Sequence, residues 1–272
     1  MIAKVKIIGG LGNQLFQYFF ARSLSINSGC KVELDISDFS SNKYTLHKLN
    51  INQLNLKLPF SKNKFNFSNL LLKNKKEEDP FKFDENIFKK KYASYQGYWQ
   101  SYKYFEKNWH NFKDDINFEK FNHNFEILNE IKRSNSISVH IRRGDYIENS
   151  KTSQFHGNIK LNYYKNAINN IQNKIENSKF FFFSDDIEWV KKNFSDKKFY
   201  FVENSKQDLK TPFKDLFLMK NCKHNIIANS TFSWWGAWLN ENNNKIVLAP
   251  KDWTTNRKTI TTDLIPKWWH IA

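Results

Sequence analysis

Four consecutive phenylalanines, Phe180 to Phe183, constrain the fold more than any other stretch, and they run directly into Ser184-Asp185-Asp186. A segment that is apolar at every position fits a strand buried on both faces. Helical patterns and short apolar runs alternate after it: helix over 187–193, strand over 199–202, helix over 212–222, strand over 225–228, helix over 232–239 and strand over 245–249. This alternation predicts a parallel sheet covered by helices on both faces.

The beginning of the chain shows the same pattern with a glycine-rich turn. A predicted strand over Val5–Ile8 leads into Gly9-Gly10-Leu11-Gly12-Asn13-Gln14, after which apolar residues recur at helical spacing from Leu15 to Leu24. A turn of this kind before a helix suits an anion or a close ligand approach. It lacks the third glycine of the dinucleotide fingerprint and the Lys-Ser/Thr of a Walker loop. Both ends of the chain are therefore predicted to be Rossmann-like, with a cleft between two lobes.

The stretch from Ser136 to Asp145 is predicted to be a strand that runs into a polar turn. Successive side chains of a strand alternate, so Val139 and Ile141 share one face, and His140 and Arg142 share the other. Ligands of open α/β sheets bind beyond the carboxyl ends of the strands, where Arg142 to Asp145 would lie. Because a guanidinium binds phosphate oxygens in pairs, the stretch indicates the rim of an anion site. An Arg–Asp ion pair that closes the turn is the alternative.

Two further strand ends carry polar groups, Asp185-Asp186 and Ser230-Thr231. The second pair begins a helix, where free N–H groups and the helix dipole favour phosphate, although simple capping is the alternative. Together with Arg142, these groups describe a site for a nucleotide diphosphate. Carboxylates there would bind ribose hydroxyls or a guanine N–H edge.

The sequence of residues 39–120 predicts less about structure and function. Lys73 to Pro80 is predicted to be a charged, solvated loop. Tyr95 to Phe105 is dense in rings, with Gln and Ser between them. That composition suits a surface that contacts sugar, and equally a half-buried packing segment between domains.

The composition limits the class of partner. The net charge is +16, but the lysines are scattered along the chain and do not form one stripe. We therefore predict a solvated basic surface, with peripheral attraction to an anionic membrane as a by-product, and no nucleic-acid partner. Cys30 and Cys222 form neither a disulfide framework nor a metal-type spacing. The N-terminus lacks a signal peptide's apolar region, and no stretch approaches the ~20 apolar residues of a membrane span, so we expect a soluble, cytoplasmic protein.

Several of these motifs resemble a known family. His140-Ile141-Arg142-Arg143-Gly144-Asp145 resembles the HxRRxD signature of the α1,2-, α1,6- and protein O-fucosyltransferase superfamily. The turn from Gly9 to Gln14 is similar to its glycine-rich Asn-Gln motif, and Asp215 to Met219 and Asn229 to Trp238 are similar to its third and fourth blocks. With Gly97-Tyr98-Trp99-Gln100-Ser101, the combination resembles glycosyltransferase family 11, the bacterial galactoside α1,2-fucosyltransferases. The resemblance is weakest over residues 39–90.

The resemblance implies an α/β fold of the GT-B type, with GDP-β-L-fucose as the donor and inversion at the anomeric carbon. The acceptor would be the 2-hydroxyl of a terminal galactose in a surface glycan of the O-antigen or capsule type. The predicted domains are an acceptor-side lobe over 1–132, a GDP-sugar-binding lobe over 133–250, and a segment over 251–272 that packs back on the first lobe.

The same resemblance assigns roles to residues. Arg142 would bind the β-phosphate and stabilise the departing GDP, and Asn13 would lie near the reacting centre. His140 and Asp215 would contact guanine, and Ser230 and Thr231 would hold phosphates. The full set of predicted donor-binding residues is His140, Arg142, Asp185, Asp215, Ser230, Thr231 and Phe232. The predicted acceptor-binding residues are Tyr98, Trp99 and Gln100.

No cofactor and no divalent metal are expected, because a guanidinium already stabilises the leaving group. Asp185-Asp186 resembles a metal-binding carboxylate pair, but a turn after a buried strand, or ribose contacts, is the preferred interpretation. Asp145 is the best carboxylate candidate for the general base, and it is also a candidate for orienting Arg142 or Arg143. Arg143 is predicted to be structural or paired with Asp145.

Other functions are compatible with the sequence. A transferase with another GDP-sugar or another linkage would share the same motifs. A glycan-binding protein without catalysis would use the Trp-rich surface and have no affinity for GDP. A nucleic-acid binder is suggested only by the net charge, and the polar groups at the strand ends argue against it.

Overall fold

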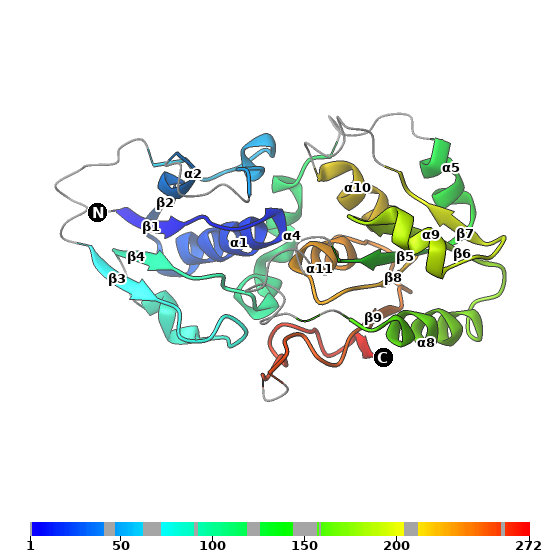
Figure 1. Ribbon diagram of the computed structural model, residues 1–272. Helices are drawn as coiled ribbons and strands as arrows, with labels where there is room; N and C mark the ends of the chain where they lie inside the picture. Colours follow the sequence, from blue (N-terminus) through cyan, green and yellow to red (C-terminus); the bar gives the residue numbers. More distant parts are fainter. Residues whose placement is uncertain are drawn as a thin grey trace. The chain divides into compact units, whose positions relative to one another are not determined.

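The computed structural model describes residues 2–40, 47–61, 72–89, 92–118, 126–143, 157, 159–203, 212–256 and 259–272. The chain divides into two compact units, the first over 1–117 and 260–266 and the second over 118–259 and 267–272. Each unit contains a parallel sheet with helices packed against it (Figure 1). The α/β class and the two Rossmann-like units of the predicted GT-B-type fold are confirmed.

The first unit is built on a four-stranded parallel sheet in the order β2-β1-β4-β3. Its strands are β1 (Ile2–Lys6), β2 (Lys31–Asp35), β3 (Lys73–Lys76) and β4 (Ala93–Gln96). The helix α1 (Leu11–Ser28) joins β1 to β2 and packs against both. The short helices are α2 (Ser37–Ser40) and α4 (Trp109–Phe112), with 3₁₀ turns at Ile51–Gln53, Glu85–Lys89, Tyr102–Tyr104, Glu106–Asn108 and Lys113–Asp115.

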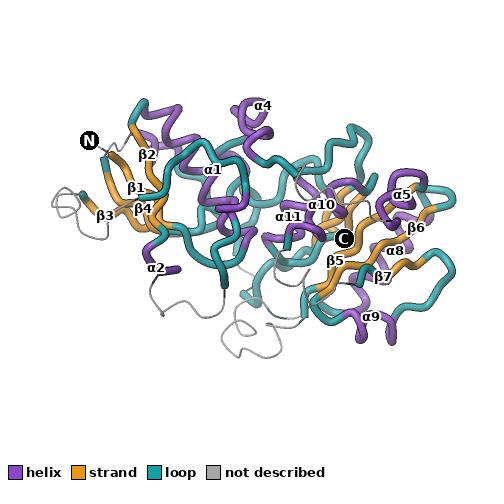
Figure 2. The backbone as a smooth tube through the Cα atoms, turned by 90° about the horizontal axis from the view of Figure 1, so that it is seen from above, coloured by secondary structure: helices purple, strands orange, loops and turns teal. Residues whose placement is uncertain are grey.

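The second unit is built on a six-stranded parallel sheet in the order β10-β9-β8-β5-β6-β7. Its strands are β5 (Asn135–Ile141), β6 (Ser178–Ser184), β7 (Phe199–Phe201), β8 (His224–Ile226), β9 (Val247–Ala249) and β10 (His270–Ile271). Counted along the chain from β5, this is the Rossmann order 3-2-1-4-5-6. The helices are α5 (Glu126–Arg133), α8 (Leu161–Gln172), α9 (Ile187–Asn193), α10 (Phe213–Asn221) and α11 (Thr231–Trp238). Figure 2 shows the strands of each unit in orange and its helices in purple.

The two faces of β5 differ as the alternation of its residues requires. Ile137, Val139 and Ile141 join one hydrophobic cluster with α8, α9 and the phenylalanines Phe180 and Phe182. The opposite face is polar: Asn225 donates to Ser138 Oγ at 2.7 Å, and the His140 ring lies 5.5 Å from the Phe232 ring. The apolar face anchors the strand, and the polar face is directed toward α10 and α11.

The structure corrects two boundaries and one element. The first unit ends at 117 and not at 132, because α5 buries Leu128 and Ile131 against α10 and β5. Of the segment 251–272, only residues 260–266 belong to the first unit, and the remainder belongs to the second. The predicted solvated loop over 73–80 begins with β3, an edge strand that pairs in parallel with β4. No helix within the described ranges is long and apolar enough to cross a membrane.

Candidate functional site

The strand order places the candidate donor site at the carboxyl ends of β5 and β8. These neighbouring strands lie where the sheet's order reverses, and such a switch point is where open α/β sheets bind their ligands. His140 and Arg142 belong to the end of β5, and Ser230 belongs to the loop after β8. The strands pair with Val139 opposite Ile226, so the two ends lie side by side. The topology therefore brings together two of the polar groups that the sequence predicted at strand ends.

Arg142 is held by a carboxylate from the next strand. Its Nη1 lies 3.0 Å from Asp185 Oδ2, and the other oxygen of Asp185 accepts from the Arg143 backbone N–H at 2.9 Å. Both side chains of the pair remain partly exposed. The sequence predicted Asp185 as a donor-binding residue, and the structure shows it first as the partner that orients Arg142.

Arg143 has different partners from Arg142. Its guanidinium lies 3.8 Å from the centroid of the Trp189 ring, and its Nε donates to Asp186 Oδ2 at 3.3 Å. Asp186 in turn caps α9 by accepting from the Trp189 backbone N–H at 3.1 Å. The predicted structural role of Arg143 fits these contacts. The partner named with that role, Asp145, lies outside the described residues.

His140 is a neutral, buried ring. Its side chain is 5% exposed, and burial, followed by the charge of Arg142, lowers the pKa of His140 to about 3. Its Nδ1 has no hydrogen-bond partner within the described part of the chain. Because a buried polar atom is ordinarily satisfied, this nitrogen suits a polar group of a ligand.

The N-terminus of α11 completes this edge of the sheet. Ser230 precedes the helix in extended conformation, is buried, and makes no side-chain capping hydrogen bond. Simple capping by the Ser230 hydroxyl is therefore wrong. Thr231 opens the helix, and Phe232 follows it against His140. Asp215 lies in the first turn of α10, which packs against α11.

The first unit has a switch point of its own, between β1 and β4. The first turn of α1, which follows β1, and the loop after β4 are joined by the predicted residues Asn13 and Gln100, because Gln100 Nε2 donates to Asn13 Oδ1 at 2.9 Å. Trp99 is 2% exposed, and its ring stacks on Phe20 with centroids 4.1 Å apart. Tyr98 lies in the same loop. Trp99 is thus a packing residue, so its predicted contact with the acceptor would come from its backbone and not from its ring.

Two predictions remain: a carboxylate that acts as the general base, and a site without a divalent metal. Asp145, the candidate base, lies outside the described residues. Within the described ranges, no three His, Cys, Asp or Glu side chains gather as metal ligands. Asp185 and Asp186 each pair with a guanidinium, as described above.

A family comparison fits this geometry. The family model of glycosyl transferase family 11 matches residues 2–272. The chain belongs to glycosyl transferase family 11.

Curated relatives agree with this family. An α-1,2-colitosyltransferase of Escherichia coli is 32% identical over 98% of this chain and 98% of its own length. The O-antigen biosynthesis glycosyltransferase WbnK of Escherichia coli is 35% identical over 94% of this chain and 96% of its own length. The human galactoside α-(1,2)-fucosyltransferase 1 is 29% identical over 38% of this chain and 28% of its own length.

Two glutamines shape the glycine-rich turn of this family 11 chain: Gln14, which the sequence placed in the motif without a role of its own, and Gln17, which it did not single out. Gln14 is fully buried; its Nε2 donates to the backbone oxygens of Gly9 and Lys48, and its Oε1 accepts from the backbone N–H of Asn50 at 2.9 Å. Gln17 accepts from the Ile8 N–H and donates to the Gly97 carbonyl at 3.0 Å. The available signal was an amide at positions 14 and 17, among the closely spaced apolar residues of the first half of α1.

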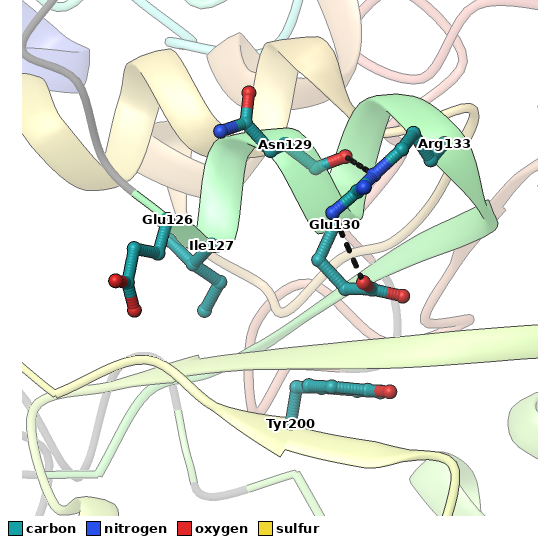
Figure 3. A pocket seen from close by; sticks show the side chains of 6 residues that line it. All are labelled: Glu126, Ile127, Asn129, Glu130, Arg133 and Tyr200. Atoms are coloured by element: carbon teal, nitrogen blue, oxygen red, sulfur yellow. Dashed lines mark hydrogen bonds and ion pairs between the residues drawn. The ribbon is translucent and has the colours of Figure 1, made fainter.

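A separate hollow of about 530 Å³ lies between α5 and β7 in this family 11 protein (Figure 3). It is lined by Glu126, Ile127, Asn129, Glu130, Arg133 and Tyr200. Of the predicted site residues that the structure describes, none lines it. The hollow therefore does not form part of the candidate donor site.

Proposed function

We propose that this glycosyltransferase transfers L-fucose from GDP-β-L-fucose, with inversion, to the 2-hydroxyl of a terminal galactose in surface-glycan synthesis. The observation that carries the proposal is the Arg142 guanidinium, held by Asp185 beside the switch point of a Rossmann-ordered sheet. The relatives support its finer parts. Two of them are named for α-1,2 transfer, and one is named for O-antigen biosynthesis.

The proposed chemistry follows the movement of charge. Breaking the bond between fucose and phosphate leaves negative charge on GDP, and a preorganised cation stabilises that charge most in the transition state. Arg142 is the proposed cation, and Asp185 keeps its planar group oriented. The backbone N–H groups at the start of α11, near Ser230 and Thr231, are the proposed second contact to phosphate.

The nucleoside is proposed to bind beside these groups. The neutral His140 ring offers an unpartnered Nδ1, and Asp215 is the proposed carboxylate for guanine. Phe232 lies against the His140 ring and would border the same site. Tyr98, Trp99 and Gln100 remain the proposed acceptor-binding residues of the first unit, with Trp99 acting through its backbone. Asn13 remains the proposed residue near the reacting centre.

We propose that no divalent metal takes part. Asp185 and Asp186 are each matched by a guanidinium, so this carboxylate pair has no excess charge for a cation. The base role of Asp145 and the attraction of the basic surface to an anionic membrane remain predictions.

A second donor has a specific observation in its favour. The relative that matches 98% of this chain is named a colitosyltransferase, and colitose is L-fucose without its 3-hydroxyl. Both donors would present the same diphosphate to Arg142. The residues that contact the sugar, and not those that bind the nucleotide, would therefore select between the two donors.

The test is a transfer assay with purified protein, each GDP-sugar in turn, and a panel of galactose-terminated acceptors, with and without chelator. We expect an α1,2 linkage in the product and full activity in chelator. Arg142→Ala should lower kcat at least ~100-fold, whereas Arg143→Ala, a matched neighbour, should retain at least about a tenth of it because Arg143 packs on Trp189. Wild-type turnover by Arg142→Ala, or a strict metal requirement, would contradict the proposal.

A further inference from the structure

Glu77 lies directly after the edge strand β3 and turns its carboxylate to the loop that follows β4. Its Oε2 accepts from the Tyr98 backbone N–H at 2.6 Å, and its Oε1 accepts from the Trp99 backbone N–H at 2.7 Å. Its own N–H donates to the Gln96 carbonyl at 2.9 Å, which extends the pairing of the two strands. One carboxylate thus binds two successive amides of the loop that carries the proposed acceptor residues.

The loop is shaped around this carboxylate. A Cβ added at Gly97 would lie 2.5 Å from the Cβ of Glu77, so the close approach requires glycine at 97. Trp99 has φ 54°, a left-handed conformation that is uncommon for a bulky residue. Such a conformation persists only where its surroundings hold it. The two bonds to Glu77 and the stacking of Trp99 on Phe20 hold it here.

The loop is also tied to the N-terminal half of α1. Gln17 donates to the Gly97 carbonyl at 3.0 Å, and Gln100 donates to Asn13 at 2.9 Å. Glu77 fixes the two residues between these ties. A displacement of Tyr98 and Trp99 would therefore reach Gln100 and, through it, Asn13.

We propose that Glu77 is a positioning residue that holds the Tyr98–Gln100 loop in the conformation that binds the acceptor sugar. This inference rests on the proposed function, because it concerns the acceptor side of the same transfer. Nothing in the residue's sequence context, a run of Lys and Glu, distinguishes it from a solvated glutamate.

The positioning should depend on pH near neutrality. Burial raises the pKa of Glu77 to about 7, although the two amide donors act in the opposite direction. The neighbouring Asp79 carboxylate raises it further. The charge of Glu77 helps to raise the pKa of Tyr104, although burial is the main cause, so the Tyr104 phenol stays neutral. As pH falls through about 7, one oxygen of Glu77 becomes a hydroxyl, and the double acceptor is lost.

The experiment measures steady-state kinetics with donor and acceptor varied separately, from pH 6 to pH 8.5. Glu77→Gln replaces one accepting oxygen by an amide donor that faces a backbone N–H. We expect its KM for the acceptor to rise at least about fivefold at pH 8, with the KM for the donor and the affinity for GDP within about twofold of wild type. Glu78→Gln changes the exposed neighbour and should behave as wild type.

The wild-type profile provides a second readout. Its KM for the acceptor should rise as pH falls from 8 to 6, and this rise should be absent in Glu77→Gln. Glu77→Asp, which keeps a carboxylate, should restore part of the pH dependence. A wild-type acceptor KM that does not change over this range would overturn the pH dependence, and an acceptor KM of Glu77→Gln equal to that of the wild type would overturn the positioning role. If Glu77→Gln fails to fold, an acceptor KM of Glu77→Asp equal to that of the wild type would do the same, because the shorter side chain cannot keep both bonds in place.

The two proposals fail in different ways. If the wild-type protein transfers neither sugar to any galactoside, the proposed function fails. If transfer occurs, but Glu77→Gln has the wild-type acceptor KM and pH profile, the proposed function stands and the role of Glu77 is wrong.

Discussion

Arg142 and Arg143 are neighbours in the chain, but their charges are used differently. Arg142 pairs with Asp185 and remains 30% exposed at the carboxyl edge of the sheet. Arg143 lies over the Trp189 ring and pairs with Asp186, which caps α9. The first guanidinium is oriented toward a ligand site, and the second is part of the packing around α9.

This difference predicts that Asp185→Asn and Asp186→Asn, which have the same change of side chain, lower kcat to different extents. Asp185→Asn removes the charge that orients Arg142, and kcat should fall about tenfold or more, because misplacing a catalytic group costs rate steeply. Stability should change by less than about 1 kcal/mol, since the pair is partly exposed. Steady-state kinetics and urea unfolding measure the two effects.

Asp186→Asn is the matched control for that prediction. Asparagine also caps helices, so α9 should survive, and kcat should stay within a few-fold of wild type. Equal losses of kcat in the two variants would contradict the special role of Asp185.

At the scale of elements, α11 begins at the candidate donor site and ends on a partly buried lysine. Lys245 Nζ donates to the backbone oxygens of Ala237, Trp238 and Asn240 at 2.8, 3.4 and 2.5 Å. Burial lowers the pKa of Lys245 to about 8, so the ammonium is still present at neutral pH. A cation at a helix C-terminus also complements the helix dipole.

Lys245→Met should therefore destabilise the protein. The variant leaves these carbonyls without their charged donor, and we expect a loss of about 2 kcal/mol in the free energy of unfolding at pH 7. Urea denaturation checks this value. Lys251→Met, at an exposed position, should stay within about 0.5 kcal/mol of wild type. A similar loss in both variants would show that methionine, and not the missing ammonium, is responsible.

The strands differ in how well the sequence predicts them. Continuous apolar runs locate β6, β9 and the end of β8, because strands of a covered parallel sheet are buried at nearly every position. The strand β3 has the sequence Lys-Asn-Lys-Lys and no apolar residue. It is an edge strand that pairs through its backbone, so no hydrophobic pattern could reveal it.

The candidate site shows the same limit. Strand ends predict where His140, Arg142 and Ser230 lie, because alternation reveals β5 and the apolar run Ile226-Ile227-Ala228 marks the end of β8. They do not predict that Asp185 pairs with Arg142, or that Glu77 binds the loop after β4. Those contacts depend on which strands become neighbours, and the order of strands in a sheet is a property of the tertiary fold.

At the scale of the molecule, each unit has its own internal supports. In the first unit, Asp115 is 1% exposed; its Oδ2 accepts from Tyr18 Oη at 2.5 Å and from Arg22 Nε at 2.7 Å. Burial and the hydrogen bond to Asp115 raise the pKa of Tyr18 well above its usual value, so the phenol remains a donor.

Asp115→Asn should destabilise the protein strongly, because it leaves Arg22 largely buried without its counter-charge. We expect a loss of about 3 kcal/mol, seen in calorimetry as a fall of several degrees in Tm. Asp114→Asn changes the exposed neighbour and should leave Tm nearly unchanged. A Tm for Asp115→Asn equal to that of Asp114→Asn would show that the buried carboxylate contributes little.

The path of the chain between the units has a consequence for shortening the protein. Residues 260–266 belong to the first unit, where Asp263 pairs with Lys103 at 2.5 Å and accepts from the Phe83 N–H at 2.9 Å. Residues 267–272 return to the second unit and supply β10. A stop codon after Thr259 would therefore damage both units at once. Neither unit can be obtained as an intact fragment by one cut in the chain.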